Sequence, residues 1–168
     1  MDVLEAIRTK HSVRQFQDKP LPDEVVRAIL EAGRRAPSSR NTQPWVFLAI
    51  RERERLVKMA EISVTAKHLT GAALGVVILT PDPSQSYHIM FDAGMAATYM
   101  MFAAWEQGVG SCVGSINGTE EARQFLGFPS DFHARICLSF GYSLEAPRPA
   151  RKGGRKPFDE VVRWETWS

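Results

Sequence analysis

Apolar residues recur along this chain with two different spacings, and each spacing predicts one kind of secondary structure. After Pro22, apolar side chains return every three or four residues, which is typical of an amphipathic helix that begins at a proline. Uninterrupted apolar runs over residues 45–50 and 74–80 are instead typical of buried strands. The pattern predicts helices over residues 3–10, 22–33, 52–62 and 88–107, a short helix capped by Thr119, and strands over residues 45–50, 74–80, 108–116 and 135–140.

These elements follow one another without a strict alternation of strand and helix, which favours the α+β class over a doubly wound sheet. The chain has 168 residues, which is enough for one domain with a substantial core, and no repeat or internal linker divides it. We therefore predict a single α+β domain over residues 1–168.

The stretch over residues 88–107 is apolar on nearly all sides when it is drawn as a helix. A helix without a polar face must be buried on most sides, and a domain of this size can hardly bury one completely by itself. Its many alanine and glycine residues also allow another helix to approach closely. The sequence therefore predicts a long central helix with part of its surface at a subunit interface, and a purely internal helix is the alternative.

The composition argues against several classes of protein. With 44% hydrophobic and 24% charged residues, the chain is typical of a folded domain. A net charge of +2 is too small to argue for nucleic acid, and no apolar run reaches the roughly 20 residues of a membrane helix. The N-terminus lacks the pattern of a secretion signal. Because Cys112 and Cys137 lack metal-ligand spacing, we expect two buried thiols, no metal site and a cytoplasmic protein.

Three polar clusters carry the candidate chemistry. Residues 10–16 bring together lysine, histidine, serine and arginine, and residues 151–157 are strongly basic. Between them, residues 36–45 combine hydroxyls, amides and an arginine with two prolines, which makes a stiff loop rich in hydrogen-bond donors. In sequence and in order, these clusters resemble the nitroreductase family of FMN-dependent flavoenzymes, and the resemblance extends from about residue 1 to residue 164.

The resemblance implies a fold, an assembly and a reaction. It implies a central mixed sheet flanked by helices and a homodimer formed through the long central helix, with two FMN sites at the subunit interface. The C-terminal arm, about residues 146–168, would pack on the partner subunit. The implied reaction is a ping-pong transfer of hydride from NADH or NADPH, through flavin N5, to a nitroaromatic, a quinone or a similar small acceptor. No nucleic acid, membrane or catalytic side chain is implied.

The cofactor explains why these residue types are needed. The phosphate of FMN needs cations and forked donors, and the pyrimidine edge of its ring system takes hydrogen bonds. By resemblance, Lys10 and Ser12 contact the phosphate and ribityl chain, Arg14 lies along the pyrimidine edge, and Arg155 holds the phosphate. The loop would reach the flavin bound mainly by the partner, while Gly114 and Ser115 would place backbone N–H groups near N5 and O4. The predicted cofactor-binding residues are Lys10, His11, Ser12, Arg14, Pro37, Ser38, Ser39, Asn41, Gln43, Gly114, Ser115 and Arg155.

Other interpretations stay open. The first cluster is compatible with a solvated basic turn, the loop with a plain connector, and the basic tail with a solvated or nucleic-acid-binding segment. Lys67 and His68 are expected at the surface, with a flavin or substrate contact as the alternative. Only residues 81–87 stand where longer relatives carry a lid, so the substrate is not predicted. Alternatives are a specialised reaction on the same fold (dehalogenation, azoline oxidation, flavin breakdown) and a non-catalytic flavin-binding protein.

Overall fold

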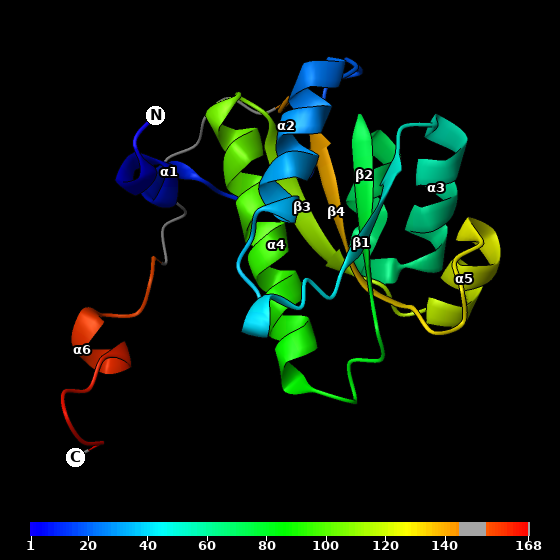
Figure 1. Cartoon of the computed structure of the whole chain (residues 1–168). Helices are drawn as coiled ribbons and strands as arrows, with labels where there is room; N and C mark the ends of the chain where they lie inside the picture. The colour runs from blue at the N-terminus through cyan, green and yellow to red at the C-terminus, as the bar shows by residue number, and fades with distance from the viewer. Residues whose placement is uncertain (145–153, 168) are drawn as a thin grey trace.

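A four-stranded sheet in the order β1-β2-β4-β3 forms the centre of the protein (Figure 1). The computed structural model describes residues 1–144 and 154–167. Its strands are β1 (Val46–Ile50), β2 (Leu74–Thr80), β3 (Gly110–Ser115) and β4 (His133–Gly141). All seven residues of β2 are buried, because this strand has neighbours on both sides and helices over both faces.

The prediction of a mixed sheet is wrong for the described residues, since β1 with β2, β2 with β4, and β3 with β4 all pair antiparallel. β2 and β3 point the same way and are joined by a helix, which is the usual arrangement of parallel neighbours. However, β4 inserts between them and pairs with both. Among the described residues, the one parallel pairing is an isolated bridge between Ser12 and Ser111. The predicted α+β class is confirmed.

Two layers of helix cover the sheet. On one face, α2 (Asp23–Arg34) packs against α4 (Tyr87–Glu106), around a core that includes Ile29, Met100 and Phe140. The other face is covered by α3 (Arg53–Ile62), the 3₁₀ segment η2 (Val64–Gly71) and α5 (Thr119–Leu126). α2 and α4 approach so closely that a Cβ at Gly33 would lie 2.2 Å from Met100 Cε.

The helices begin and end close to their predicted positions, with one correction at α5. The N-cap of α5 is Gly118, and Thr119 is its first residue. The Thr119 hydroxyl donates to the carbonyl of Ala134 over 3.1 Å, so it ties the helix to β4 and does not cap it. At the N-terminus, Asp2 caps the short α1 (Val3–Thr9) by accepting from the Glu5 amide.

The long helix α4 is not buried all round in the single chain. One side of it packs on the sheet and on α2, while Phe91, Gly94, Thr98 and Tyr99 are exposed. These residues repeat at spacings of three and four, so they form one stripe along the helix, with the half-buried Met95 in the same stripe. The stripe is a mainly apolar helix face that the described part of this chain leaves uncovered.

The C-terminal helix α6 (Phe158–Val161) lies away from the sheet (Figure 1). Around it, Phe158, Val161, Trp164 and Trp167 are all more than half exposed. The Phe158 and Trp164 rings pack on each other with centroids 6.4 Å apart. The three apolar cores of the described residues contain none of these side chains. Large aromatic side chains are therefore exposed to solvent on this segment.

Candidate functional site

The first predicted cluster lies against β3. The bridge between Ser12 and Ser111 and a 3.0 Å hydrogen bond from the Val13 amide to the Ser111 carbonyl hold it there. Val13 is buried against Gly110, where a Cβ would lie 2.7 Å from the valine side chain. Because the pairing is parallel, the chain after Ser12 runs along β3 in the direction of Gly114.

Several polar groups of this cluster have no partner in the described part of the chain. The Arg14 guanidinium and the Ser12 hydroxyl are exposed and make no hydrogen bond or ion pair with described residues. Lys10 is half-buried and also lacks a carboxylate partner there; its Nζ lies 3.3 Å from Met101 Sδ. Burial lowers the pKa of Lys10, against a smaller opposing effect of Cys112. A set of cationic and hydroxyl donors without acceptors is suited to bind an anion.

His11 differs from these neighbours, because its ring already packs within the chain. It lies edge-on to Trp105 with centroids 4.9 Å apart, and its Nδ1 is 3.1 Å from the Thr9 carbonyl. The geometry gives His11 a structural role at the end of α1. Its predicted contact with a cofactor stays a prediction.

His68 is a buried residue of this region, and the expectation of a surface position is wrong for it, although Lys67 is exposed. The segment η2 turns the ring towards β3 and β4, where Nδ1 lies 2.7 Å from Ser139 Oγ. Its Nε2 is buried and has no hydrogen-bond partner among the described residues. Burial and then the nearby Arg14 charge lower the pKa of His68, against a smaller opposing effect of the Val113 backbone, so its neutral form is favoured.

Gly114 lies directly beside this histidine. A Cβ on Gly114 would stand 3.2 Å from His68 Nε2 and 3.0 Å from Ala66 Cβ, so this position has little room for a side chain. The next residue, Ser115, is exposed, but its amide already donates to Thr65 Oγ1 over 3.0 Å. The structure therefore brings together Ser12, Arg14, His68 and Gly114, while the amide predicted at Ser115 is paired within the chain.

The second cluster forms a tight, strained loop. It includes the 3₁₀ turn η1 (Ser39–Asn41), and three of its residues have left-handed backbone angles: φ is 52° at Arg40, 57° at Asn41 and 48° at Gln43. Each such residue other than glycine costs on the order of 1 kcal/mol, and clusters of them occur at functional sites. Within the loop, the Gln43 amide donates to Ser38 Oγ over 2.9 Å.

The loop and the first cluster lie at different ends of α4. The loop is attached near the start of the helix, where the Ser39 amide donates to Asp92 Oδ2 over 3.0 Å. The first cluster contacts the far end, at Met101. Nine residues separate these two points, so they stand about 14 Å apart along the helix axis at 1.5 Å per residue. The third element, Arg155, is exposed on the C-terminal segment.

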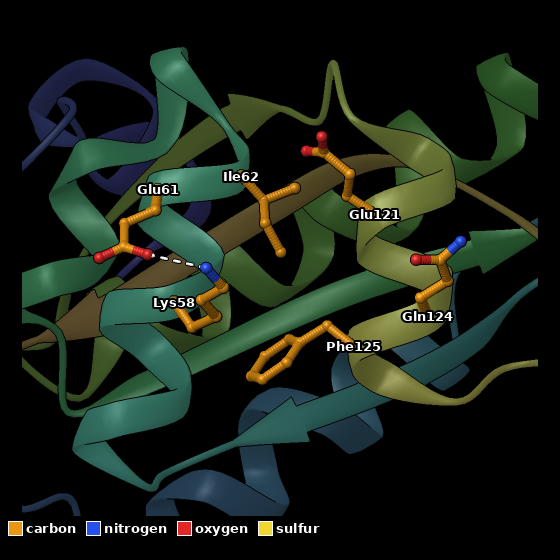
Figure 2. Close-up of a pocket in the computed structure, with 6 residues that line it drawn as sticks. All are labelled: Lys58, Glu61, Ile62, Glu121, Gln124 and Phe125. Atoms are coloured by element: carbon orange, nitrogen blue, oxygen red, sulfur yellow. Dashed lines mark hydrogen bonds and ion pairs between the residues drawn. The ribbon is translucent and has the colours of Figure 1, made fainter.

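Two grooves on the surface lie away from the predicted residues. One of about 470 Å³ lies between α3 and α5, where Figure 2 shows Lys58 paired with Glu61 on one side and Phe125 on the other. The other, of about 630 Å³, lies between α2 and β1. Neither contains a predicted site residue. The described residues hold no cluster of metal-ligand side chains, and none of their helices is long and apolar enough to cross a membrane.

Known proteins resemble this chain in sequence and in fold. A sequence profile described as Nitroreductase family matches residues 7–79 and 63–142. A relative from Archaeoglobus fulgidus, whose name assigns it provisionally as an NADH dehydrogenase/NAD(P)H nitroreductase, is 32% identical over 148 residues, which are 84% of this chain and 85% of that protein.

Solved structures show the same fold. An FMN-dependent nitroreductase from Clostridium difficile superposes with a TM-score of 0.88 at 24% identity, covering 98% of this chain and 100% of that chain. A protein from Parabacteroides distasonis, provisionally named like the relative from Archaeoglobus fulgidus, has a TM-score of 0.86 at 26% identity, and 98% of each chain is covered. The chain belongs to the nitroreductase family of oxidoreductases.

Proposed function

We propose that this protein is an FMN-dependent oxidoreductase that takes hydride from NADH or NADPH and delivers it to a nitroaromatic, a quinone or a similar small acceptor. The observation that carries the proposal is the set of polar side chains that lies beside β3. There, the exposed Ser12 and Arg14 follow the bridge to Ser111 along β3, and the buried His68 lies beside Gly114 with its Nε2 close to that glycine.

The residues present fit FMN. The buried His68 Nε2, which makes no well-formed hydrogen bond within the described residues, gives the region beside β3 a polar character that a polar cofactor would match. The unpaired cations Lys10 and Arg14 and the Ser12 hydroxyl match a ligand that carries both a phosphate and a polar ring edge. When bound, FMN would supply the hydride chemistry at its N5.

The side chains of this protein would bind and orient the cofactor. Arg14 would bind the pyrimidine edge, where its positive charge stabilises negative charge that develops during reduction. Lys10 and Ser12 would hold the phosphate and the ribityl chain, with Arg155 as a further phosphate ligand. Gly114, which has no side chain, would let the ring system of the flavin lie close to β3. No nucleophile or general base is needed from the protein.

A homodimer would complete the site. In one chain the strained loop is held about 14 Å along α4 from the first cluster, so a second copy can bring its loop to the first copy's cofactor. Two further features support pairing: the uncovered stripe on α4 and the exposed aromatic side chains around α6, which we expect to pack on the partner. Both cysteines are free and buried, which supports a reducing, cytoplasmic setting.

The absorption spectrum of the purified protein tests the function. We expect flavin bands that bleach when NADH or NADPH is added without oxygen and that return when a quinone or nitroaromatic follows. Bands that do not bleach would instead favour a specialised reaction or a flavin-binding role. A colourless protein that takes up no added FMN would contradict the proposal. Comparing rates with the two nicotinamides establishes which one the enzyme prefers.

Arg14→Ala is expected to weaken FMN binding by roughly tenfold to a hundredfold, since it removes a charge-assisted hydrogen-bond donor worth about 1.5–3 kcal/mol. It is also expected to slow reduction by NAD(P)H. The measurements are fluorescence titration with FMN and stopped-flow bleaching. Arg8→Ala is the matched control, because Arg8 is an exposed arginine of α1 outside the site. If Arg14→Ala and Arg8→Ala have the same FMN affinity and the same rate of reduction, the role given to Arg14 is wrong.

A further inference from the structure

Asp92 is a buried carboxylate in the second turn of α4, with 1% of its surface exposed. Its neighbours along the core side of the helix, Ala93, Ala96 and Ala97, are small and apolar. A buried charge costs free energy that a small apolar residue would avoid, so stability of the helix alone does not explain an aspartate here. Its position beyond the first turn also keeps it from capping the helix.

The carboxylate does make one contact outside the helix. Its Oδ2 accepts a 3.0 Å hydrogen bond from the Ser39 amide, across 53 positions of sequence. Ser39 is the first residue of η1, and it precedes the three residues with left-handed φ. A loop that contains such unfavourable backbone angles keeps its shape only when its surroundings hold it.

The rest of the loop is bonded mainly to itself. The Asn41 amide donates to the Ser38 carbonyl, the Thr42 amide to the Ser39 carbonyl, and the Gln43 amide to Ser38 Oγ, each at 2.9–3.0 Å. These bonds fix the internal shape of the loop but do not attach it to the domain. The bond to Asp92 attaches it to α4, the helix that carries the uncovered stripe.

We infer that Asp92 is a positioning residue, which holds the donor-rich loop over residues 38–43 in the strained shape and place needed to reach the cofactor of the partner subunit. The inference rests on the proposed function, because the loop acts on FMN. Asp92 itself touches the loop backbone and acts on the cofactor only through it.

Two variants test the inference. Asp92→Ala removes the acceptor, and we expect the Kd of FMN to rise by about tenfold or more. Asp92→Asn keeps an oxygen that can accept from the Ser39 amide, so we expect it to restore binding to within about threefold of the parent. Ala97→Gly is the matched control for stability, because it weakens the same helix at a buried position that makes no hydrogen bond to the loop. Its thermal midpoint is expected to fall while its FMN affinity stays unchanged.

Hydrogen exchange of the loop amides gives a readout that does not depend on the cofactor. In the apoprotein, the amides of residues 39–43 are expected to exchange about tenfold faster in Asp92→Ala than in the parent or in Ala97→Gly. Unchanged exchange in Asp92→Ala would overturn the positioning role, as would FMN binding equal to that of the parent. If the parent itself binds no FMN, the proposed function fails, and the exchange result alone then decides whether Asp92 holds the loop.

Discussion

Replacing Gly94 by glutamate is expected to give a folded monomer that no longer retains FMN. Gly94 lies in the middle of the uncovered stripe of α4, between Phe91 and Thr98, and a Cβ added there would meet nothing within 4 Å in the single chain. The substitution therefore costs the monomer nothing in packing, and it removes a glycine that weakens a helix by about 1 kcal/mol. Within an apolar dimer interface, the same side chain would bury an unpaired charge, which interfaces tolerate poorly.

The mass in solution and the flavin content measure this effect. We expect the variant to elute at half the mass of the parent, with an unchanged helical circular dichroism signal and FMN affinity reduced by roughly a hundredfold or more. Gly71→Glu is the matched control, since a Cβ at Gly71 also meets nothing within 4 Å and Gly71 is in η2, outside the stripe of α4. A Gly94→Glu protein that remains dimeric and yellow would show that the stripe is not the interface.

The helices and strands could be predicted from the sequence because each depends mainly on the pattern of residues within the element itself. The apolar spacing after Pro22 and the run that forms β2 each depend on residues within one element. The order of the strands depends on pairings between distant segments. No local pattern shows that β4 inserts between β2 and β3, so the sequence could not correct the mixed sheet that the resemblance implied, and an antiparallel sheet is found.

The same distinction applies to the site. Motifs indicated which residue types belong to it, but the burial of His68 follows from its contact with Ser139, 71 positions away. The local sequence around Lys67 and His68 does not indicate that the histidine is buried. The separation of the loop from the first cluster along α4 is likewise a property of the folded chain. Such facts require the tertiary structure, because each of them joins segments that are far apart in sequence.

Removing residues 154–168 is expected to leave the domain folded while abolishing its flavin binding. None of the three apolar cores includes a residue of this segment, so we expect the far-ultraviolet circular dichroism and a cooperative thermal transition to persist. The deletion removes Arg155, the expected phosphate ligand, together with the exposed aromatic side chains of Phe158, Trp164 and Trp167. In a dimer these rings would bury large apolar areas on the partner, and such aromatic residues dominate interface energies.

Point variants separate the two contributions of this segment. Arg155→Ala is expected to weaken FMN binding by about tenfold or more and to leave the dimer intact, because it removes one charged contact. Trp164→Ala is expected to shift the equilibrium towards monomer, because Trp164 is 73% exposed in the single chain, packs there against Phe158 and would be covered by the partner. The fraction of protein that binds flavin is expected to fall with the fraction of dimer. Analytical ultracentrifugation at several protein concentrations, together with FMN titration, measures both effects. If Trp164→Ala dimerises as the parent does, the C-terminal segment does not pack on the partner through this ring.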